Sequence, residues 1–395
     1  MTKITYIDEV TITDKQVFLR VDFDVSLHDN YTISDDIRIK QKLPTLKLLL
    51  KNRNRIICVS KLNRPKDRSP HHSMHVVAER LQTYFPEYTV RLIDDFLTEN
   101  PETFTKQTEK EILVLENIRF YPEEKNNDPV FAKKLADLAD VYVNDAFAMC
   151  HRTETSIVDV PMLLPSYGGL ELKEEITALN KAIQHPKRPL VAIIGGAKIS
   201  TKITLISKLI ERADAVILGG GLANVFFRAQ RYSIGKSIGE YEMVLKARQL
   251  LFLAAQKKTS IILPTDVIIG DPKNKDKAGE IKMIGEKIPS NLSILDIGPD
   301  SKAKFGAIIA SARTIIWNGP VGLFENPTYR HGTDFIYYAI AHNPNATSLV
   351  GGGDTLAAIN NKKYLEKITH ISTGGGAMLE FIEKGTLPGI EALKH

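Results

Sequence analysis

The segment 195–202, GGAKISTK, combines residue types that can hold a phosphate chain. Two glycines follow an apolar run, and Lys198 and Lys202 stand four residues apart. Glycine lets the backbone turn sharply and approach a ligand, and lysine follows a phosphoryl group as a mobile point charge. If Ser200 caps the next helix, Lys202 lies in its first turn, where a cation is disfavoured unless an anion is close. The segment therefore predicts contact with phosphate, against the alternative of two solvated lysines.

Three glycine triplets in the same half of the chain each follow a strand-like apolar run. They occupy positions 219–221, 351–353 and 374–376. Ligands of open α/β sheets bind at the carboxyl ends of strands, and a helix that begins there offers N–H groups to phosphate. With the pair at 195–196, these turns favour a nucleotide site, although close helix packing also requires some glycines. The P-loop pattern fails because Gln230 stands where its first glycine is needed, and no triplet extends to the dinucleotide motif.

Acidic residues follow two of the turns. In WNGPVGLFE, Glu325 lies beyond a Gly-Pro turn, where a carboxylate can accept hydrogen bonds from ribose hydroxyls. In GGGDT, Asp354 and Thr355 begin a predicted helix. Asp354 could cap that helix, but one carboxylate together with nucleotide phosphates is also a typical Mg²⁺ site.

Cationic residues recur in the first half of the chain, at strand ends and in turns. Arginine binds carboxylate and phosphate in a bidentate manner, so the set suits a small substrate that bears both groups. Scattered arginines are usually solvated, but these stand where strand ends should meet a shared crevice. The set consists of Arg20, Arg38, Arg64, Arg119 and Arg152, with Lys61 and His151 close in sequence.

Positioning these residues requires parallel strands covered by crossover helices. Short apolar runs alternate with segments of helical period, which is typical of α/β proteins. We expect two doubly wound parallel sheets, joined by an amphipathic helix over 170–184 that Pro186 and Pro189 end. The predicted strands are 17–25, 56–60, 90–93, 112–115, 141–144, 189–194, 215–218, 261–263, 314–317 and 348–350, and helices are predicted over 74–85 and 131–139.

Length and composition restrict the class of protein. With 395 residues, 25% of them charged and 43% hydrophobic, the chain is long enough for two or three ordinary globular domains. Its net charge of +5 is lower than a nucleic-acid binder usually carries. Two cysteines exclude a disulfide framework, and no apolar run reaches the roughly 18 residues that span a bilayer. We expect a cytoplasmic monomer with no nucleic-acid or membrane partner.

Eleven motifs, in order and across essentially the whole chain, resemble the phosphoglycerate kinase family. They are RVDFDVS, SDDIRI, SKLNRP, LENIRFYPEE, VNDAFAMCHR, IIGGAKISTK, ILGGGLA, DIGP, WNGPVGLFE, VGGGDT and HISTGGGAMLEF. The resemblance implies two Rossmann-like domains, over 1–168 and 187–375, an interdomain helix over 169–186 with a hinge, and a segment over 376–395 that returns to the first domain. It also implies a glycolytic kinase that transfers phosphoryl reversibly between ATP and the carboxylate of 3-phosphoglycerate, giving 1,3-bisphosphoglycerate and ADP.

The resemblance assigns roles to individual residues. The acidic-substrate site would use Arg20, Asp22, Asp24, Arg38, Lys61, Arg64, Arg119, His151 and Arg152. The nucleotide site would use Gly195, Gly196, Lys198, Lys202, Gly220, Gly221, Asn318, Glu325, Gly352, Gly353, Asp354 and Thr355, with Asp354 on Mg²⁺. Arg38, Lys198, Gly375 and Gly376 would stabilise the moving phosphoryl group. A carboxylate nucleophile is already ionised, so catalysis reduces to positioning and charge neutralisation.

Eight positions depart from the family pattern, most of them around the acidic substrate. The family has Asn at Asp24, Pro at Ser26, His at Lys61, Gly at Asn63, Gly at Ala148, Ala at Cys150, His at Glu154 and Asp at Thr201. An unpaired Asp24 or Glu154 would repel an anionic substrate. We therefore expect Lys61 to pair with one of these carboxylates, unless Glu154 simply points into solvent.

Two other functions stay open because the pocket is altered. One is an acyl-phosphate-forming kinase for a related acidic substrate. The other is a nucleotide-binding member of the family without turnover, against which Arg38, Lys198, Lys202 and Asp354 argue.

Overall fold

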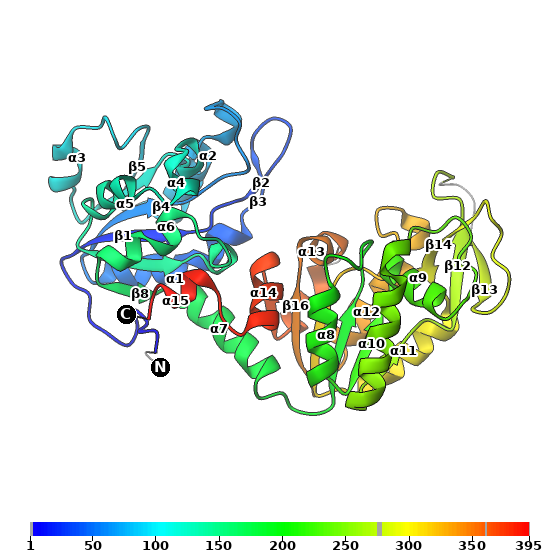
Figure 1. Ribbon diagram of the computed structural model, residues 1–395. Helices are drawn as coiled ribbons and strands as arrows, with labels where there is room; N and C mark the ends of the chain where they lie inside the picture. The colour runs from blue at the N-terminus through cyan, green and yellow to red at the C-terminus, as the bar shows by residue number, and fades with distance from the viewer. Residues whose placement is uncertain (1–2, 275–278, 360–361, 395) are drawn as a thin grey trace. The chain divides into compact units, whose positions relative to one another are not determined.

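The computed structural model of the protein describes residues 3–274, 279–359 and 362–394, and the chain divides into two compact units (Figure 1). Unit 1 comprises the chain up to Thr177 together with the C-terminal segment from Lys384, and unit 2 runs from Ala178 to Glu383. The two terminal segments therefore belong to the same unit. In the described ranges, no helix is both long and apolar enough to cross a membrane.

Unit 1 is built around one parallel sheet. Its strands are β1 (Gln16–Val21), β2 (Ser26–Leu27), β3 (Ile33–Asp35), β4 (Arg55–Val59), β5 (Thr89–Ile93), β6 (Glu111–Leu115), β7 (Val141–Asp145) and β8 (Ser166–Gly168). Its helices are α1 (Ile37–Lys51), α2 (His75–Tyr84), α3 (Pro101–Thr105), α4 (Glu123–Asn126), α5 (Pro129–Ala136), α6 (Thr155–Val158) and α15 (Pro388–Glu391). Six strands form the sheet in the order β5-β6-β4-β1-β7-β8, and β2 pairs with β3 in an antiparallel ribbon. β1 is central and fully buried, as its run of apolar residues requires.

Unit 2 repeats this design with a second parallel sheet. Its strands are β9 (Leu190–Ile194), β10 (Ala215–Leu218), β11 (Ser260–Ile262), β12 (Asp266–Gly270), β13 (Glu280–Met283), β14 (Ser293–Ile297), β15 (Thr314–Asn318), β16 (Thr347–Gly351) and β17 (His370–Ser372). Its helices are α8 (Ile203–Arg212), α9 (Gly220–Ala229), α10 (Val244–Lys257), α11 (Pro299–Ser311), α12 (His331–Ala341), α13 (Gly353–Ala358) and α14 (Gly376–Lys384). The main sheet has the order β11-β10-β9-β15-β16-β17. Counted along the chain this is 3-2-1-4-5-6, the order of dinucleotide-binding sheets, which reverses between β9 and β15.

The sequence predicted both parallel sheets, and the predicted strands and helices are confirmed. β1 ends at Val21 rather than at residue 25, because the N–H of Phe23 donates to the Ser60 hydroxyl (2.9 Å) instead of to a neighbouring strand. The antiparallel sheet β13-β12-β14 was not predicted. Its strands are only four or five residues long, which is too short for a clear periodic pattern in the sequence.

The C-terminal return is shorter than the predicted segment 376–395. The helix α14 belongs to unit 2 as far as Glu383, and the chain returns to unit 1 from Lys384 onward. The physical reason is packing, since Met378 of α14 lies directly against Gly351 at the end of β16. From there the chain continues to α15, which contacts α6 of unit 1.

The helix α7 (Leu170–Ile183) contains the division between the units, and its first turn is fastened to unit 1. Asp145, the last residue of β7, accepts hydrogen bonds from the N–H groups of Glu171 (2.9 Å) and Leu172 (3.1 Å). Lys42 of α1 pairs with Glu171 at 2.9 Å, and both side chains are buried. Burial acts to lower the pKa of Lys42, but the Glu171 and Asp145 carboxylates outweigh it and raise that pKa. The buried contact between Lys42 and Glu171 therefore ties α1 to the first turn of α7.

Removing Lys42 alone should destabilise unit 1 strongly. Lys42→Met leaves Glu171 and Asp145 buried without their cation, which typically costs about 3–5 kcal/mol. The double variant Lys42→Met, Glu171→Leu should recover most of the loss, because a buried ion pair can be replaced by apolar groups at little cost. Urea denaturation followed by circular dichroism measures both effects. Lys40→Met is the matched control on the exposed face of α1; a loss at Lys42 no larger than at Lys40 would contradict this role.

Candidate functional site

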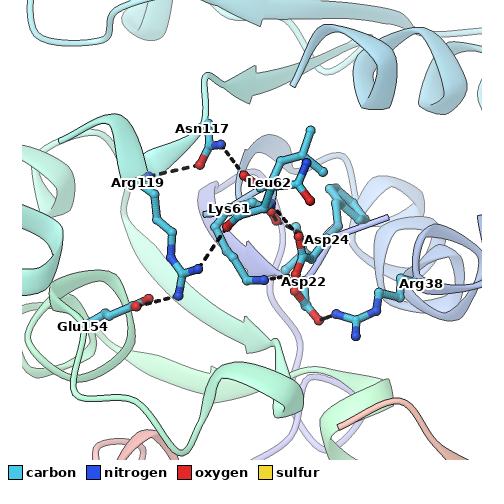
Figure 2. Close-up of polar contacts among 12 residues, drawn as sticks. Asp22, Asp24, Arg38, Lys61, Leu62, Asn117, Arg119 and Glu154 are labelled. Atoms are coloured by element: carbon cyan, nitrogen blue, oxygen red, sulfur yellow. Dashed lines mark hydrogen bonds and ion pairs between the residues drawn. The ribbon is translucent and has the colours of Figure 1, made fainter. Parts of the chain in front are cut away.

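Acidic and basic side chains meet at the carboxyl ends of the central strands of unit 1 (Figure 2). Asp22 and Asp24 follow β1, Lys61 follows β4, and Arg119 follows β6. Arg38 comes from the first turn of α1, and the chain before α6 adds Glu154. Parallel strands bring their carboxyl ends to one edge of the sheet, so residues distant in sequence form one cluster here.

The pairing expected of Lys61 is confirmed, with Asp24 as its partner. The ammonium group forms an ion pair with one carboxylate oxygen, and the other accepts a hydrogen bond from the N–H of Asn63 (2.6 Å). The Lys61 side chain is only 9% exposed and that of Asp24 22%. Burial lowers the pKa of Lys61, and the Asp22 and Asp24 carboxylates oppose that shift. The two substitutions therefore balance each other's charge.

Glu154 pairs with Arg119, not with Lys61. A terminal nitrogen of Arg119 (Nη2) donates to Oε1 of Glu154 at 2.8 Å, and Nη1 donates to the carbonyl of Asn63 at 3.0 Å. The two side chains are 9% and 10% exposed. The idea that Glu154 points into solvent is therefore wrong. Its carboxylate is drawn inward because a buried guanidinium lies within hydrogen-bonding distance.

Asn63 joins the two ion pairs. Its backbone is left-handed, with φ +58°, a conformation that Asn adopts more readily than most residues and that explains glycine in the family pattern. Through its N–H it contacts Asp24, and through its carbonyl it contacts Arg119. Four of the eight departures, at Asp24, Lys61, Asn63 and Glu154, thus belong to one connected network.

Asp22 and Arg38 form a third ion pair in this cluster. Asp22 is buried, whereas the Arg38 side chain is 29% exposed. Burial acts to raise the pKa of Asp22, but the charges of Arg38 and Lys61 outweigh it and hold that pKa below its usual value. An ionised Asp22 therefore orients Arg38 while leaving part of its guanidinium accessible.

Arg20, also predicted for the substrate site, lies in the interior of unit 1. Its side chain is completely buried, with Nε donating to the Ser156 hydroxyl at 2.8 Å. Ser156 in turn donates to Glu124 through its hydroxyl (2.6 Å) and its N–H (2.9 Å). Burial raises the pKa of Glu124 to about 7, and the charge of Arg20 opposes this shift. Arg20 therefore connects β1 to α6 and, through Ser156, to α4, and its contact with substrate stays a prediction.

The other predicted substrate residues lie around the network. Arg64 and Arg152 are exposed and His151 is half-buried. The sequence did not single out Asn117, which braces the segment that carries Arg119. Its side chain accepts from the N–H of Arg119 (3.1 Å) and donates to the carbonyls of Leu62 (2.7 Å) and His72 (2.8 Å). Its position directly after a buried strand was the one available signal.

In unit 2, the glycine turns meet where the strand order reverses. Gly196 and Gly220 have positive φ (+110° and +65°), and their N–H groups donate to the carbonyls of Pro320 (2.8 Å) and Val321 (3.0 Å). A Cβ at Gly195 would collide with the Pro320 carbonyl. Close packing of backbone segments therefore requires these glycines, and it brings the ends of β9, β10 and β15 together.

Other glycines differ in what they face. Gly352 has no room for a side chain because the Asn318 amide lies against it. A Cβ at Gly353 or Gly375 would meet nothing within 4 Å, so these backbones border open space. Gly376 is exposed at the first residue of α14.

A cavity of about 270 Å³ opens beside these turns. Five predicted nucleotide residues line it, namely Gly196, Gly220, Gly221, Glu325 and Asp354. Apolar side chains from the β15–α12 connection and from β14 form much of the remaining wall, including Val321, Phe324 and Ile294. A cavity with apolar walls and a few polar groups suits a planar ring with polar substituents. The antiparallel sheet that the sequence did not predict thus contributes to this cavity.

Lys202 and Lys198 occupy different environments. Lys202 is the residue directly before α8, and its ammonium group donates to the carbonyl of Gly195 at 2.7 Å. Burial lowers its pKa to about 8, although the Asp354 carboxylate acts in the opposite direction. Lys198 is exposed. Ser200 does not cap α8, because its hydroxyl and its N–H (2.9 Å) both bond to Glu240, which the sequence did not suggest.

Asp354 and Thr355 also separate into different roles. The Thr355 hydroxyl accepts from the N–H of Gly319 (2.7 Å) and donates to the Gly351 carbonyl (2.9 Å), which makes it a packing contact between strand ends. Asp354 is exposed beside the cavity. Within the ranges that the structure describes, no group of three or more His, Cys, Asp or Glu could hold a metal. Mg²⁺ needs only one or two carboxylates when phosphates supply other ligands, so Asp354 fits that ion.

Comparisons with known proteins agree on one family. The family model described as phosphoglycerate kinase matches residues 7–385. The chain is 43% identical to the phosphoglycerate kinase of Koribacter versatilis over 403 residues, covering all of both chains. It is 42% identical to a cytosolic phosphoglycerate kinase of Arabidopsis thaliana, covering 98% of this chain and 96% of that one. The solved phosphoglycerate kinase of Coxiella burnetii superposes with a TM-score of 0.88 at 37% identity, covering 99% of this chain and 98% of that one.

The Lys61–Asp24 pair should be coupled in a double-mutant cycle. Asp24→Asn leaves the buried ammonium group of Lys61 without its charged partner. Lys61→Met removes the ion pair of Asp24 and leaves it the hydrogen bond from the N–H of Asn63. We expect a coupling of about 1–3 kcal/mol in the free energy of unfolding, because contacting charges fail to add. The exposed pair Lys106–Glu102 is the control and should show little coupling. Single effects at Lys61 and Asp24 that add within about 0.3 kcal/mol would refute the pairing.

Proposed function

The chain belongs to the phosphoglycerate kinase family, and on that premise we propose how its residues share the reaction between the two units. The activity is that of a glycolytic phosphotransferase. It moves a phosphoryl group reversibly between ATP and the carboxylate of 3-phosphoglycerate, giving 1,3-bisphosphoglycerate and ADP. Neither a kinase for a different acidic substrate nor a member without turnover is favoured over this activity.

Unit 1 binds 3-phosphoglycerate at the carboxyl ends of β1, β4 and β6. The single observation that supports this placement is the convergence there of three basic side chains, Arg38, Lys61 and Arg119, from separate elements. The exposed Arg64 and Arg152 add charge at the rim. Arginines at such an edge can bind both a carboxylate and a phosphate in a bidentate manner.

Unit 2 binds the nucleotide in the cavity beside the glycine turns. The apolar wall suits the base, and Glu325 is available to the ribose hydroxyls. Lys202 lies half-buried at the reversal of strand order, and its pKa is lowered to about 8. A phosphate chain would raise that pKa again, because a nearby anion favours the charged form. The sheet order 3-2-1-4-5-6 places these groups where such folds bind nucleotides.

Transfer needs charge neutralisation and no general base. The attacking carboxylate of 3-phosphoglycerate is ionised at neutral pH, so no proton has to be removed from the nucleophile. Arg38 from unit 1 and Lys198 from unit 2 lie on accessible surface and would stabilise the charge of the moving group. The backbone N–H groups of Gly375 and Gly376, at the start of α14, border open space and would assist. Asp354 would hold Mg²⁺, which, when bound, neutralises phosphate charge.

The residues proposed for the two substrates belong to different units, so transfer requires a closed arrangement in which both substrates meet. Closure would also expel water and strengthen each charge contact. The cytosolic relative of Arabidopsis thaliana supports a cytoplasmic location. The monomeric state stays a prediction.

Replacing Arg38 or Lys198 by alanine should lower kcat far more than it raises KM. Both side chains are proposed to act on charge that is largest in the transition state, and such an arginine is worth roughly 10³–10⁵ in rate. Steady-state kinetics with varied ATP and 3-phosphoglycerate separates the two parameters. Lys208→Ala, at an exposed lysine paired with Glu211, is the control. A loss of kcat below about tenfold at both positions would contradict the assignment.

Asp354→Ala should weaken binding of Mg·ADP while leaving binding of 3-phosphoglycerate unchanged. The variant removes the one carboxylate proposed for the ion, so saturation should require a higher Mg²⁺ concentration. Isothermal titration of ADP at several Mg²⁺ concentrations measures this directly, without turnover. Glu366→Ala, elsewhere in unit 2, serves as the control. Equal Mg²⁺ dependence in the two variants would exclude Asp354 as the ligand.

A further inference from the structure

The proposed 3-phosphoglycerate site already contains its own counter-charges. Three cations face three carboxylates in ion pairs, so these six side chains carry no net formal charge. The pairs are Arg38 with Asp22, Lys61 with Asp24, and Arg119 with Glu154. A site for a substrate with a carboxylate and a phosphate needs uncompensated positive charge. The exposed Arg64 and Arg152 supply such charge only at the rim, so the substrate can use a cation at the strand ends fully only when the pair that holds it opens.

The Arg119–Glu154 pair occupies both ends of the guanidinium group of its cation. Arg119 is 9% exposed, and its two terminal nitrogens already donate to Glu154 and to the Asn63 carbonyl. By contrast, the Arg38 side chain is 29% exposed. An anion can thus approach Arg38 directly, whereas it can contact Arg119 only after a protein partner has moved away.

The same pair is also incompletely satisfied. Within the described part of the chain, Nε of Arg119 and Oε2 of Glu154 are buried without a hydrogen-bond partner. Asp24 differs, because both of its oxygens are used, one by Lys61 and one by the N–H of Asn63. A buried pair with unsatisfied atoms gives little net stability, since desolvation offsets the attraction. Of the two pairs created by departures from the family pattern, Arg119–Glu154 is therefore the easier to exchange.

We propose that Glu154 is a specificity-determining residue, which occupies Arg119 in the free protein and must be displaced by an anionic group of the substrate. This inference rests on the proposed placement of Arg119 in the 3-phosphoglycerate site. A substrate carboxylate offers Arg119 no more charge than Glu154 does, whereas a phosphate dianion offers more charge and a bidentate contact. The exchange therefore selects phosphorylated acids over simple carboxylates, at the expense of overall affinity.

The test is a cycle of four proteins: the parent chain, Glu154→Gln, Arg119→Ala and the double variant. Glutamine keeps an oxygen that can accept from Arg119 but removes the competing charge. Titration calorimetry measures the Kd of 3-phosphoglycerate and, as a phosphate-free acid, of glycerate. Glu87→Gln, at an exposed carboxylate of unit 1, is the matched control. Thermal unfolding checks that each variant folds, and Glu154→His replaces Glu154→Gln if the latter does not.

We expect Glu154→Gln to tighten 3-phosphoglycerate binding about tenfold or more. The reason is that Arg119 then becomes available for a hydrogen bond to the charged substrate. In the parent chain Arg119→Ala also leaves Glu154 unpaired, so the contribution of Arg119 is measured in the Glu154→Gln background, where the loss of affinity should be about tenfold or more. Glycerate binding should gain proportionally more than 3-phosphoglycerate binding in Glu154→Gln, so selectivity should fall.

Two results would overturn the inference in distinguishable ways. If Glu154→Gln leaves 3-phosphoglycerate binding unchanged while Arg119→Ala weakens it strongly in the Glu154→Gln background, Arg119 binds substrate without competition, so the masking by Glu154 is wrong and the proposed site stands. If Arg119→Ala has no effect in either background, Arg119 is not part of the site, and that part of the proposed function fails. A Glu154→Gln protein that binds no more tightly than Glu87→Gln also refutes the masking.

Discussion

A protein that binds a small, highly charged anion has to hold several cations close together at the end of a buried sheet before the anion arrives. Like charges in a low-dielectric setting repel one another, and a buried cation without a partner is costly. In unit 1 this constraint is met by pairing each cation of the cluster with a carboxylate. The left-handed turn at Asn63 and the hydrogen bonds of Asn117 serve these pairs. Asn63 places its N–H against Asp24, and Asn117 holds the backbone of Arg119 in position.

The two units approach phosphate chemistry differently. Unit 1 relies on side-chain charge, with Arg20 buried and connected through Ser156 to Glu124. Unit 2 relies mainly on backbone geometry at the reversal of strand order, with Lys202 as a half-buried cation. This division suits the proposed function, in which one unit would recognise a small acid by charge and the other would bind a larger ligand with a base to bury. α7, fastened by Asp145 and Lys42, connects them.

The departures from the family pattern are coupled rather than independent. Asp24 would repel substrate by itself, and Lys61 would be a buried cation by itself, but the two meet in one ion pair. Glu154 is likewise matched by Arg119, and Asn63 contacts both pairs through its backbone. Because the substituted residues form ion pairs within the cluster, they leave no buried charge without a partner and so preserve the fold. The same pairs change how readily the cations can bind an anion. Thr201 lies apart from this network, in unit 2, with its hydroxyl donating to the Lys198 carbonyl (3.1 Å).

Local patterns determined the architecture of this protein. Alternating apolar runs and helical periods were enough for two parallel sheets, and ordered motifs such as GGAKISTK and VGGGDT were enough for the family. The sequence could not show that Arg20 is buried, could not choose between Asp24 and Glu154 as the partner of Lys61, and did not reveal that Glu154 pairs with Arg119 or that Ser200 bonds to Glu240. Those outcomes depend on which side chains from distant elements share a buried volume. Strand period and turn chemistry act over a few residues and are written in the sequence, whereas the partner of a buried charge is decided by desolvation and distance after the strands have packed.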